Sequence, residues 1–270
     1  TTFSMPATLL DNADALRQAN DLAKDPAFAG RLFVQLADDP QPPAWARLLD
    51  ELKRWKEGAP NIAPMITTSG ISPFIPDDLA RWCVQLPVFD AGAGKHLLQG
   101  ISGGREVWWY VDHMPPRPYG NFFVDFKGIE HRILFWQAWA LGVRGFHYWN
   151  VNYSQPGQDP YDDLSDSTPV NGDGLLVYPG PNGPIDSLRW ELIRDGIEDY
   201  DYLALLLDRR NKLIAKGGQE ALLAKAAQIY DLGALLPDLV NFTRDTTALE
   251  ARRNAIAEMI EEMDRALGAK

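Results

Sequence analysis

The chain of 270 residues lacks the features that would indicate a disulfide-rich, membrane or nucleic-acid-binding protein. Its single cysteine, Cys83, cannot form an internal disulfide. No apolar run approaches the ~20 residues that a membrane-spanning helix needs, so we expect no membrane span. The chain has 26 Lys and Arg against 37 Asp and Glu, which gives a net charge of −11. Such a chain repels phosphate backbones, so we expect no nucleic acid partner.

Common catalytic and metal-binding motifs are missing as well. No G-x-S-x-G occurs, so the sequence does not indicate a serine nucleophile of the elbow type. The four histidines do not have metal-ligand spacing, and we expect neither a metal nor a cofactor. The chain begins at Thr1 rather than at a methionine, so we expect a leader or a larger segment upstream. The sequence does not determine the cellular compartment, although it slightly favours an extracellular or periplasmic location.

The first half of the chain alternates between strand and helix patterns. Helices with one apolar face are predicted at 44–57 and 127–141. Strands are predicted from alternating or continuous apolar residues at 31–38, 61–68, 82–89, 105–112 and 143–151. Strands separated by helices predict a parallel sheet with helical cover, which is an α/β fold. A loop rich in Gly and Pro follows, and helices then fill most of 186–270.

Five strands leave two architectures open. A (β/α)8 barrel needs eight strand–helix units over ~250 residues. The chain is therefore either an open α/β sheet or the later part of a barrel, and periodicity does not decide between them. An incomplete barrel would leave one sheet edge unpaired, and we expect association through that edge or with a missing N-terminal region.

Polar and aromatic side chains gather at the carboxyl ends of the predicted strands, where barrels and open α/β sheets bind ligands. Asp38 and Asp39 close the first strand. The later strand ends carry Tyr110, Asp112, His113, Trp149, Asn150 and Asn152. Aromatic faces beside carboxylates suit sugar rings. The alternatives are that an Asp after a strand forms a turn or caps a helix, and that the aromatic residues belong to the core.

Two segments together resemble a known family. They are YVDHMPPRPYGNFFVDFKGIEHRILFWQAWALGVRGFHYWNVNY at 110–153 and GDGLLVYPGPNGPIDSLRWELIRDGIEDYDYL at 172–203. The stretch from about Arg31 to Leu203 resembles the catalytic region of glycoside hydrolase family 123 and the bacterial proteins grouped as domain of unknown function 4091. The resemblance implies a (β/α)8 TIM-type barrel, of which this chain would hold the later strands. Residues 1–203 would then be the barrel region, and 204–270 a helical extension packed on it.

The resemblance also implies an activity, that of a retaining exo-β-N-acetylgalactosaminidase acting on a glycan or glycoconjugate. In that family the substrate's 2-acetamido oxygen attacks the anomeric carbon, so no protein nucleophile is needed. The family has an adjacent Asp-Glu pair followed by Pro. The Asp stabilises the acetamido group, and the Glu protonates the leaving oxygen. Asp38, Asp39 and Pro40 match this pattern, except that Asp39 is one methylene shorter than the family's Glu. An adjacent Asp-Asp pair serves the same chemistry in O-GlcNAcase-like enzymes.

Two alternatives stay open at this point. The chain could be a non-catalytic carbohydrate-binding or scaffold protein that keeps the barrel and has lost the acid. It could also be a glycosidase with a different sugar specificity.

Overall fold

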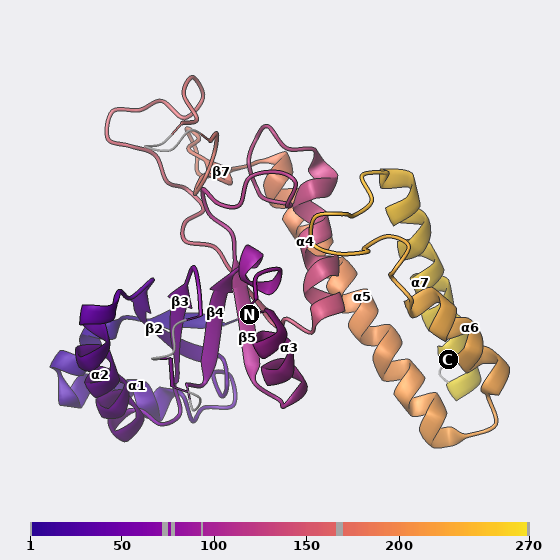
Figure 1. The fold of residues 1–270 in the computed structure, drawn as a ribbon, viewed down its shortest axis with the longest axis horizontal. Helices are drawn as coiled ribbons and strands as arrows, with labels where there is room; N and C mark the ends of the chain where they lie inside the picture. The colour runs from indigo at the N-terminus through magenta and orange to yellow at the C-terminus, as the bar shows by residue number, and fades with distance from the viewer. Residues whose placement is uncertain (1, 72–74, 77–78, 93, 166–169, 269–270) are drawn as a thin grey trace. The chain divides into compact units, whose positions relative to one another are not determined.

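A computed structural model of the protein (Figure 1) describes residues 2–71, 75–76, 79–92, 94–165 and 170–268. The chain forms two compact units. The first comprises Thr1–Tyr110 and Val143–His147, and the second comprises Val111–Gly142 and Tyr148–Lys270.

The first unit contains a six-stranded sheet in which all strands are parallel and follow one another in sequence order. The sheet curls into a half-barrel, which is consistent with part of a barrel. β1 and β6 form its two edges. The strands are β1 (Phe3–Met5), β2 (Leu32–Asp38), β3 (Ala63–Thr68), β4 (Arg81–Gln85), β5 (Glu106–Tyr110) and β6 (Gly145–His147).

Helices cover this sheet (Figure 1). α1 (Ala13–Leu22) packs against α2 (Trp45–Gly58), and α2 contacts β2 and β3. α3 (Gly94–Ser102) contacts β5. The 3₁₀ helices are η1 (Ala7–Asp11), η2 (Pro42–Ala44) and η3 (Leu86–Phe89). The predicted apolar face of α2 is confirmed, because its buried residues include Leu48, Leu52 and Trp55.

Opposite faces of the sheet carry separate apolar clusters. Val34 packs with residues of α1 and α2 on one face. The other face carries a cluster of Phe33, Met65, Cys83, Trp108 and Tyr110. Because side chains alternate along a strand, Phe33 and Val34 of β2 point to different clusters. We call the face that carries Phe33 and Tyr110 the inner face.

The predicted parallel α/β sheet is confirmed, but the strands differ in number and length. β1 is a sixth strand that the sequence pattern did not reveal, because three residues are too few to show an alternation. β4 ends at Gln85, where the chain continues as η3, so the predicted strand 82–89 is too long. β5 ends at Tyr110 rather than at residue 112.

β6 contains only Gly145–His147 of the predicted strand 143–151. The next two side chains, Tyr148 and Trp149, both donate hydrogen bonds to Asp173 in the following loop. These contacts take the chain out of the sheet directly after His147.

The second unit is mainly helical. α5 runs beside α4 and α7, and α6 packs against both α5 and α7 (Figure 1). The unit also contains a short hairpin, and its elements are α4 (Gly128–Leu141), β7 (Val177–Tyr178), β8 (Ile185–Asp186), α5 (Leu188–Lys216), α6 (Glu220–Tyr230) and α7 (Thr246–Leu267). The predicted C-terminal helices are thus confirmed. α5 continues through residue 203, and a division into 1–203 and 204–270 stays a prediction. No helix in the described part of the chain is long and apolar enough to cross a membrane.

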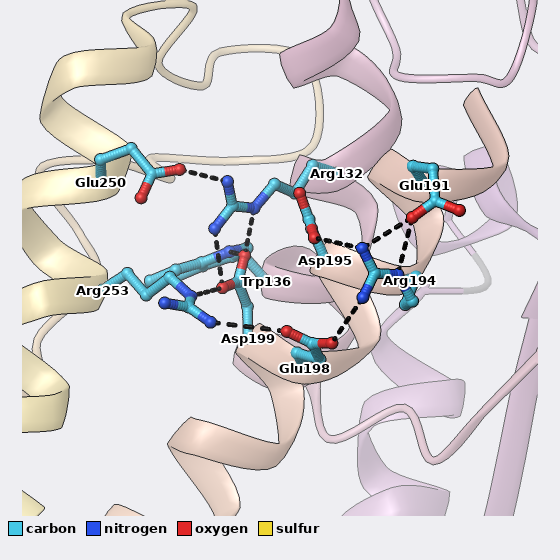
Figure 2. A network of polar contacts seen from close by, with 9 residues as sticks. All are labelled: Arg132, Trp136, Glu191, Arg194, Asp195, Glu198, Asp199, Glu250 and Arg253. Carbon is cyan, nitrogen blue, oxygen red and sulfur yellow. Dashed lines mark hydrogen bonds and ion pairs between the residues drawn. The ribbon is translucent and has the colours of Figure 1, made fainter. Parts of the chain in front are cut away.

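A buried carboxylate, Asp199 of α5, joins three helices of this unit (Figure 2). It accepts hydrogen bonds from Arg132 Nε at 2.5 Å and Trp136 Nε1 at 2.7 Å, both on α4. It also accepts one from Arg253 Nε on α7 at 2.8 Å. Arg132 in turn pairs with Glu250 of α7. A buried charge is tolerated only when it is paired and hydrogen-bonded, and Asp199 meets both conditions.

Candidate active site

Asp38, at the end of β2, is directed to the inner face by a β-bulge. The pairing between β2 and β3 skips one residue, Leu36. Because side chains alternate along a strand, this extra residue moves Asp38 onto the same face as its register partner Thr67. Thr67 Oγ1 donates to Asp38 Oδ1 at 2.6 Å and accepts from Gln35 Nε2 at 2.7 Å. The bulge thus aims an exposed carboxylate and anchors one of its oxygens.

Asp39 follows in a left-handed backbone conformation, with φ at 41°. It is the one non-glycine residue with positive φ in the described ranges. Asp tolerates this region better than most residues, and such conformations concentrate at functional sites. Its carboxylate Oδ1 accepts hydrogen bonds from the Ser69 backbone N–H at 3.0 Å and from Ser69 Oγ at 2.9 Å. The two carboxylates therefore have separate anchors on the end of β3 and the residue after it.

Further polar side chains share the inner face with Asp38. The strand register aligns Gln85, Tyr110 and His147 across β4, β5 and β6. Burial lowers the pKa of His147, and the charge of Asp38 acts in the opposite direction. Burial also raises the pKa of the Cys83 thiol well above its usual range, which makes this cysteine unreactive.

In the second unit, two aromatic side chains, Tyr148 and Trp149, donate hydrogen bonds to the buried carboxylate of Asp173. Trp149 Nε1 lies 3.1 Å from both carboxylate oxygens of Asp173, and Tyr148 donates to Asp173 Oδ1 at 3.0 Å. Asp173 is 4% exposed, whereas Trp149 is 43% exposed. The indole is therefore fixed at its nitrogen edge while much of its surface faces solvent.

Arg189, near the start of α5, ties together the loops around this pair. It is buried, and its Nη1 donates to the carbonyl oxygens of Phe122 at 2.7 Å and Gly172 at 2.8 Å. Its Nη2 donates to the carbonyl oxygen of Leu175. Arg189 therefore holds the backbone on both sides of Asp173.

Two of the other predicted residues, Asp112 and Asn150, have the contacts of turn residues. Asp112 Oδ1 accepts from the Met114 N–H at 2.8 Å, and exposed His113 lies 3.6 Å from the Asp112 carboxylate. Asn150 Oδ1 accepts from the next two backbone N–H groups, at 2.8 and 3.0 Å. The backbone contacts of Asp112 and Asn150 are typical of Asx turns and do not by themselves indicate a ligand.

Asn152 lies at the rim of a hollow of about 260 Å³, which Ser154, Leu175, Tyr178 and the turn at 179–184 also line. Asn152 itself is exposed and forms a β-bridge with Leu175.

The predicted site residues fall into two sets. Asp38, Asp39 and Tyr110 lie in the first unit, where the sheet brings them to its carboxyl-terminal end. The second unit holds Asp112, His113, Trp149, Asn150 and Asn152.

Sequence reasoning missed several residues of the site. Thr67 and Ser69 could have been found, because they close a predicted strand just as Asp38 does. Asp173 follows no predicted strand and is flanked by two glycines in a long loop, so the strand-end rule could not select it. Among the described residues, no group of three or more His, Cys, Asp or Glu side chains is arranged to hold a metal ion.

Comparison with known proteins identifies the family. The sequence profile of the glycoside hydrolase 123 catalytic domain matches residues 15–206. No curated protein sequence matches the chain. The fold is similar to a solved family 123 glycoside hydrolase from Clostridium perfringens, whose structural analysis concerns glycolipid glycan hydrolysis. The TM-score is 0.58 at 12% identity, which shows a shared fold, and the match covers 95% of this chain.

This chain spans 44% of the Clostridium perfringens chain, which is less than half of that protein's length. The profile match, by contrast, covers well over half of the 270 residues and includes the Asp38–Asp39 pair. It confirms the resemblance carried by residues 110–203. The chain therefore belongs to glycoside hydrolase family 123.

Proposed function

We propose that this chain is a glycoside hydrolase, namely a retaining exo-β-N-acetylgalactosaminidase that uses the 2-acetamido group of its substrate as the nucleophile. The observation that carries the proposal is the adjacent pair Asp38 and Asp39 at the carboxyl end of β2. Parallel α/β sheets bind ligands at this end. The separate anchors on Thr67 and Ser69 give two neighbouring carboxylates different fixed positions, as two different roles require.

The first step forms a bond between the acetamido carbonyl oxygen and the anomeric carbon while the glycosidic bond breaks. The product is a cyclic oxazolinium ion, and Asp39 donates a proton to the leaving oxygen. Asp38 accepts a hydrogen bond from the acetamido N–H and stabilises the positive charge that develops on the acetamido group. In the second step the water oxygen attacks the anomeric carbon, the bond from that carbon to the acetamido oxygen breaks, and Asp39 takes a proton from the water. Two displacements at one carbon retain its configuration.

The reach of Asp39 decides whether this scheme works, because hydrogen-bond distance is the first requirement of a general acid. Asp39 is one methylene shorter than the Glu of the family pattern. Both hydrogen bonds from Ser69 go to Oδ1. We propose that Oδ2 is the atom that meets the leaving oxygen.

We assign sugar binding to the remaining predicted residues. Trp149 would contact the C–H face of the ring, and Asn152 would bind hydroxyl groups through its amide. Tyr110, Asp112, His113 and Asn150 are proposed as further substrate contacts.

The proposal is tested by hydrolysis of three nitrophenyl β-glycosides, those of GalNAc, GlcNAc and galactose. We expect the GalNAc glycoside to be cleaved fastest and the galactoside, which lacks the acetamido group, to be cleaved at least about 10²-fold more slowly. Cleavage of the galactoside at an equal rate would contradict acetamido participation. Faster cleavage of the GlcNAc glycoside would keep the mechanism and assign a different sugar specificity.

A further inference from the structure

Trp149 combines two properties that are rarely found together. Trp149 is 43% exposed, yet its indole N–H is bound by the carboxylate of Asp173, a residue that is only 4% exposed. Nε1 lies 3.1 Å from each oxygen of Asp173, so the carboxylate straddles the N–H. An exposed indole does not need a protein partner, because water can accept its hydrogen bond. The buried carboxylate therefore fixes the direction of the ring.

The backbone after Asp173 holds the ring from another side. Gly174 has φ at 69°, and a Cβ atom at this position would lie 2.4 Å from the six-membered ring of Trp149. The indole thus packs directly on the Gly174 backbone, where only glycine fits. The Tyr153 ring lies 4.9 Å away, between centroids, at 56° to the indole. Despite these contacts, Trp149 is 43% exposed.

Tyr148 fixes the carboxylate in turn. Its hydroxyl donates to Asp173 Oδ1 at 3.0 Å and accepts from the Gly174 N–H at 2.9 Å. Burial, together with the charge of Asp173, raises the pKa of Tyr148, so its hydroxyl keeps the proton that it donates. Arg189 binds the carbonyl oxygens of Gly172 and Leu175, on either side of the Asp173–Gly174 step. The carboxylate therefore sits on a backbone that is itself immobilised.

We propose that Asp173 is a positioning residue that holds Trp149 as a preformed platform for the C–H face of a pyranose ring. The inference rests on the proposed function in one respect, namely that the ligand is a sugar. A platform fixed before binding costs no ordering of the aromatic side chain when the sugar arrives, and this strengthens binding. Asp173 does not touch the sugar, and its whole effect on binding passes through Trp149.

The test measures the dissociation constant of methyl β-N-acetylgalactosaminide by titration calorimetry, together with KM and kcat on the nitrophenyl glycoside. Trp149→Ala is expected to raise Kd about tenfold, in the range of one good aromatic contact. Asp173→Asn replaces one acceptor oxygen with an N–H₂ group, and it is expected to raise Kd and KM about 3- to 10-fold. The value of kcat should stay within about twofold, because the reacting groups are unchanged.

If Asp173 positions Trp149, the effect of Asp173→Asn on Kd depends on the presence of Trp149. If Asp173 has a general structural role, the effect is the same without Trp149. In the Trp149→Ala background, Asp173→Asn should change Kd by less than about 1.5-fold, since the residue through which it acts is gone. Trp149→Phe keeps an aromatic face without the N–H, and it should also abolish the effect of Asp173→Asn. Asp162→Asn, an exposed carboxylate of the same loop, is the matched control and should bind as the wild type does.

An equal effect of Asp173→Asn with and without Trp149 would overturn the proposal, as would wild-type affinity in both single variants. If the wild type binds the sugar and the variants behave as expected but no glycoside is cleaved, the platform stands and the proposed function fails. If the GalNAc glycoside is cleaved and the variants bind normally, the proposed function stands and the platform fails. If the wild type does not bind the sugar, both are wrong.

Discussion

Replacement of Asp39 by Asn should separate substrates according to their leaving groups. A disaccharide has a poor leaving group that must be protonated as it departs, so Asp39→Asn should lower its kcat/KM by about 10²–10⁴-fold. This corresponds to roughly 3–5 kcal/mol of transition-state stabilisation. A nitrophenolate departs without a proton, so the first step with a nitrophenyl glycoside should lose comparatively little. Steady-state rates on both substrates, measured with one enzyme preparation, provide the comparison.

Asp38→Asn provides the complementary pattern, because acetamido attack accompanies departure with either leaving group. It should therefore slow both substrates. Asp90→Asn replaces an exposed carboxylate after η3 in the same unit and is the matched control, with both rates expected to be unchanged. If Asp39→Asn leaves both rates near those of the wild type, the acid lies elsewhere, and Asp112 is the next residue to test.

Replacement of Asp199 by Ala should give the largest loss of stability. The change leaves the Arg132 guanidinium, which is mostly buried, with only the half-exposed Glu250 as a carboxylate partner. It also removes the acceptor of the Trp136 N–H. Breaking a buried ion pair from one side costs about 3–5 kcal/mol. Urea denaturation followed by far-UV circular dichroism should show a loss of this size.

Asp195→Ala, one helical turn earlier on α5, is the matched control for this prediction. Asp195 is partly exposed and lies 3.8 Å from Arg194, so its removal should change stability by less than about 1 kcal/mol. Similar small losses in both variants would mean that the network in Figure 2 contributes little to the stability of the helical unit.

The sequence predicted the parallel sheet and the helices because both depend on local periodicity. Residues 31–38 and 44–57 show their strand and helix patterns plainly, and β2 and α2 match them within one residue at each end. The end of β6 was not predictable in this way. It depends on hydrogen bonds to Asp173, which lies more than 20 residues further along the chain.

The site was partly predictable for the same reason. Asp38 and Asp39 follow a plain strand pattern, so a strand-end rule finds them. The direction of Asp38 was not predictable, because strict alternation places it on the face opposite to Gln35. The bulge at Leu36 that reverses this is a property of the pairing with β3 rather than of β2 alone. The left-handed backbone conformation of Asp39 was not predictable from the residue types either.

The nucleophilic role of the acetamido group is tested most directly by fluorinating it. Nitrophenyl β-glycosides of GalNAc that carry N-acetyl, N-fluoroacetyl, N-difluoroacetyl and N-trifluoroacetyl groups differ by one small atom at each step. Each fluorine withdraws electrons from the carbonyl oxygen and weakens it as a nucleophile. If that oxygen attacks the anomeric carbon, kcat/KM falls steeply and continuously across the series, by about 10²-fold or more in total. A flat series with all four substrates cleaved would contradict the account, because the nucleophile would then be water or a protein side chain.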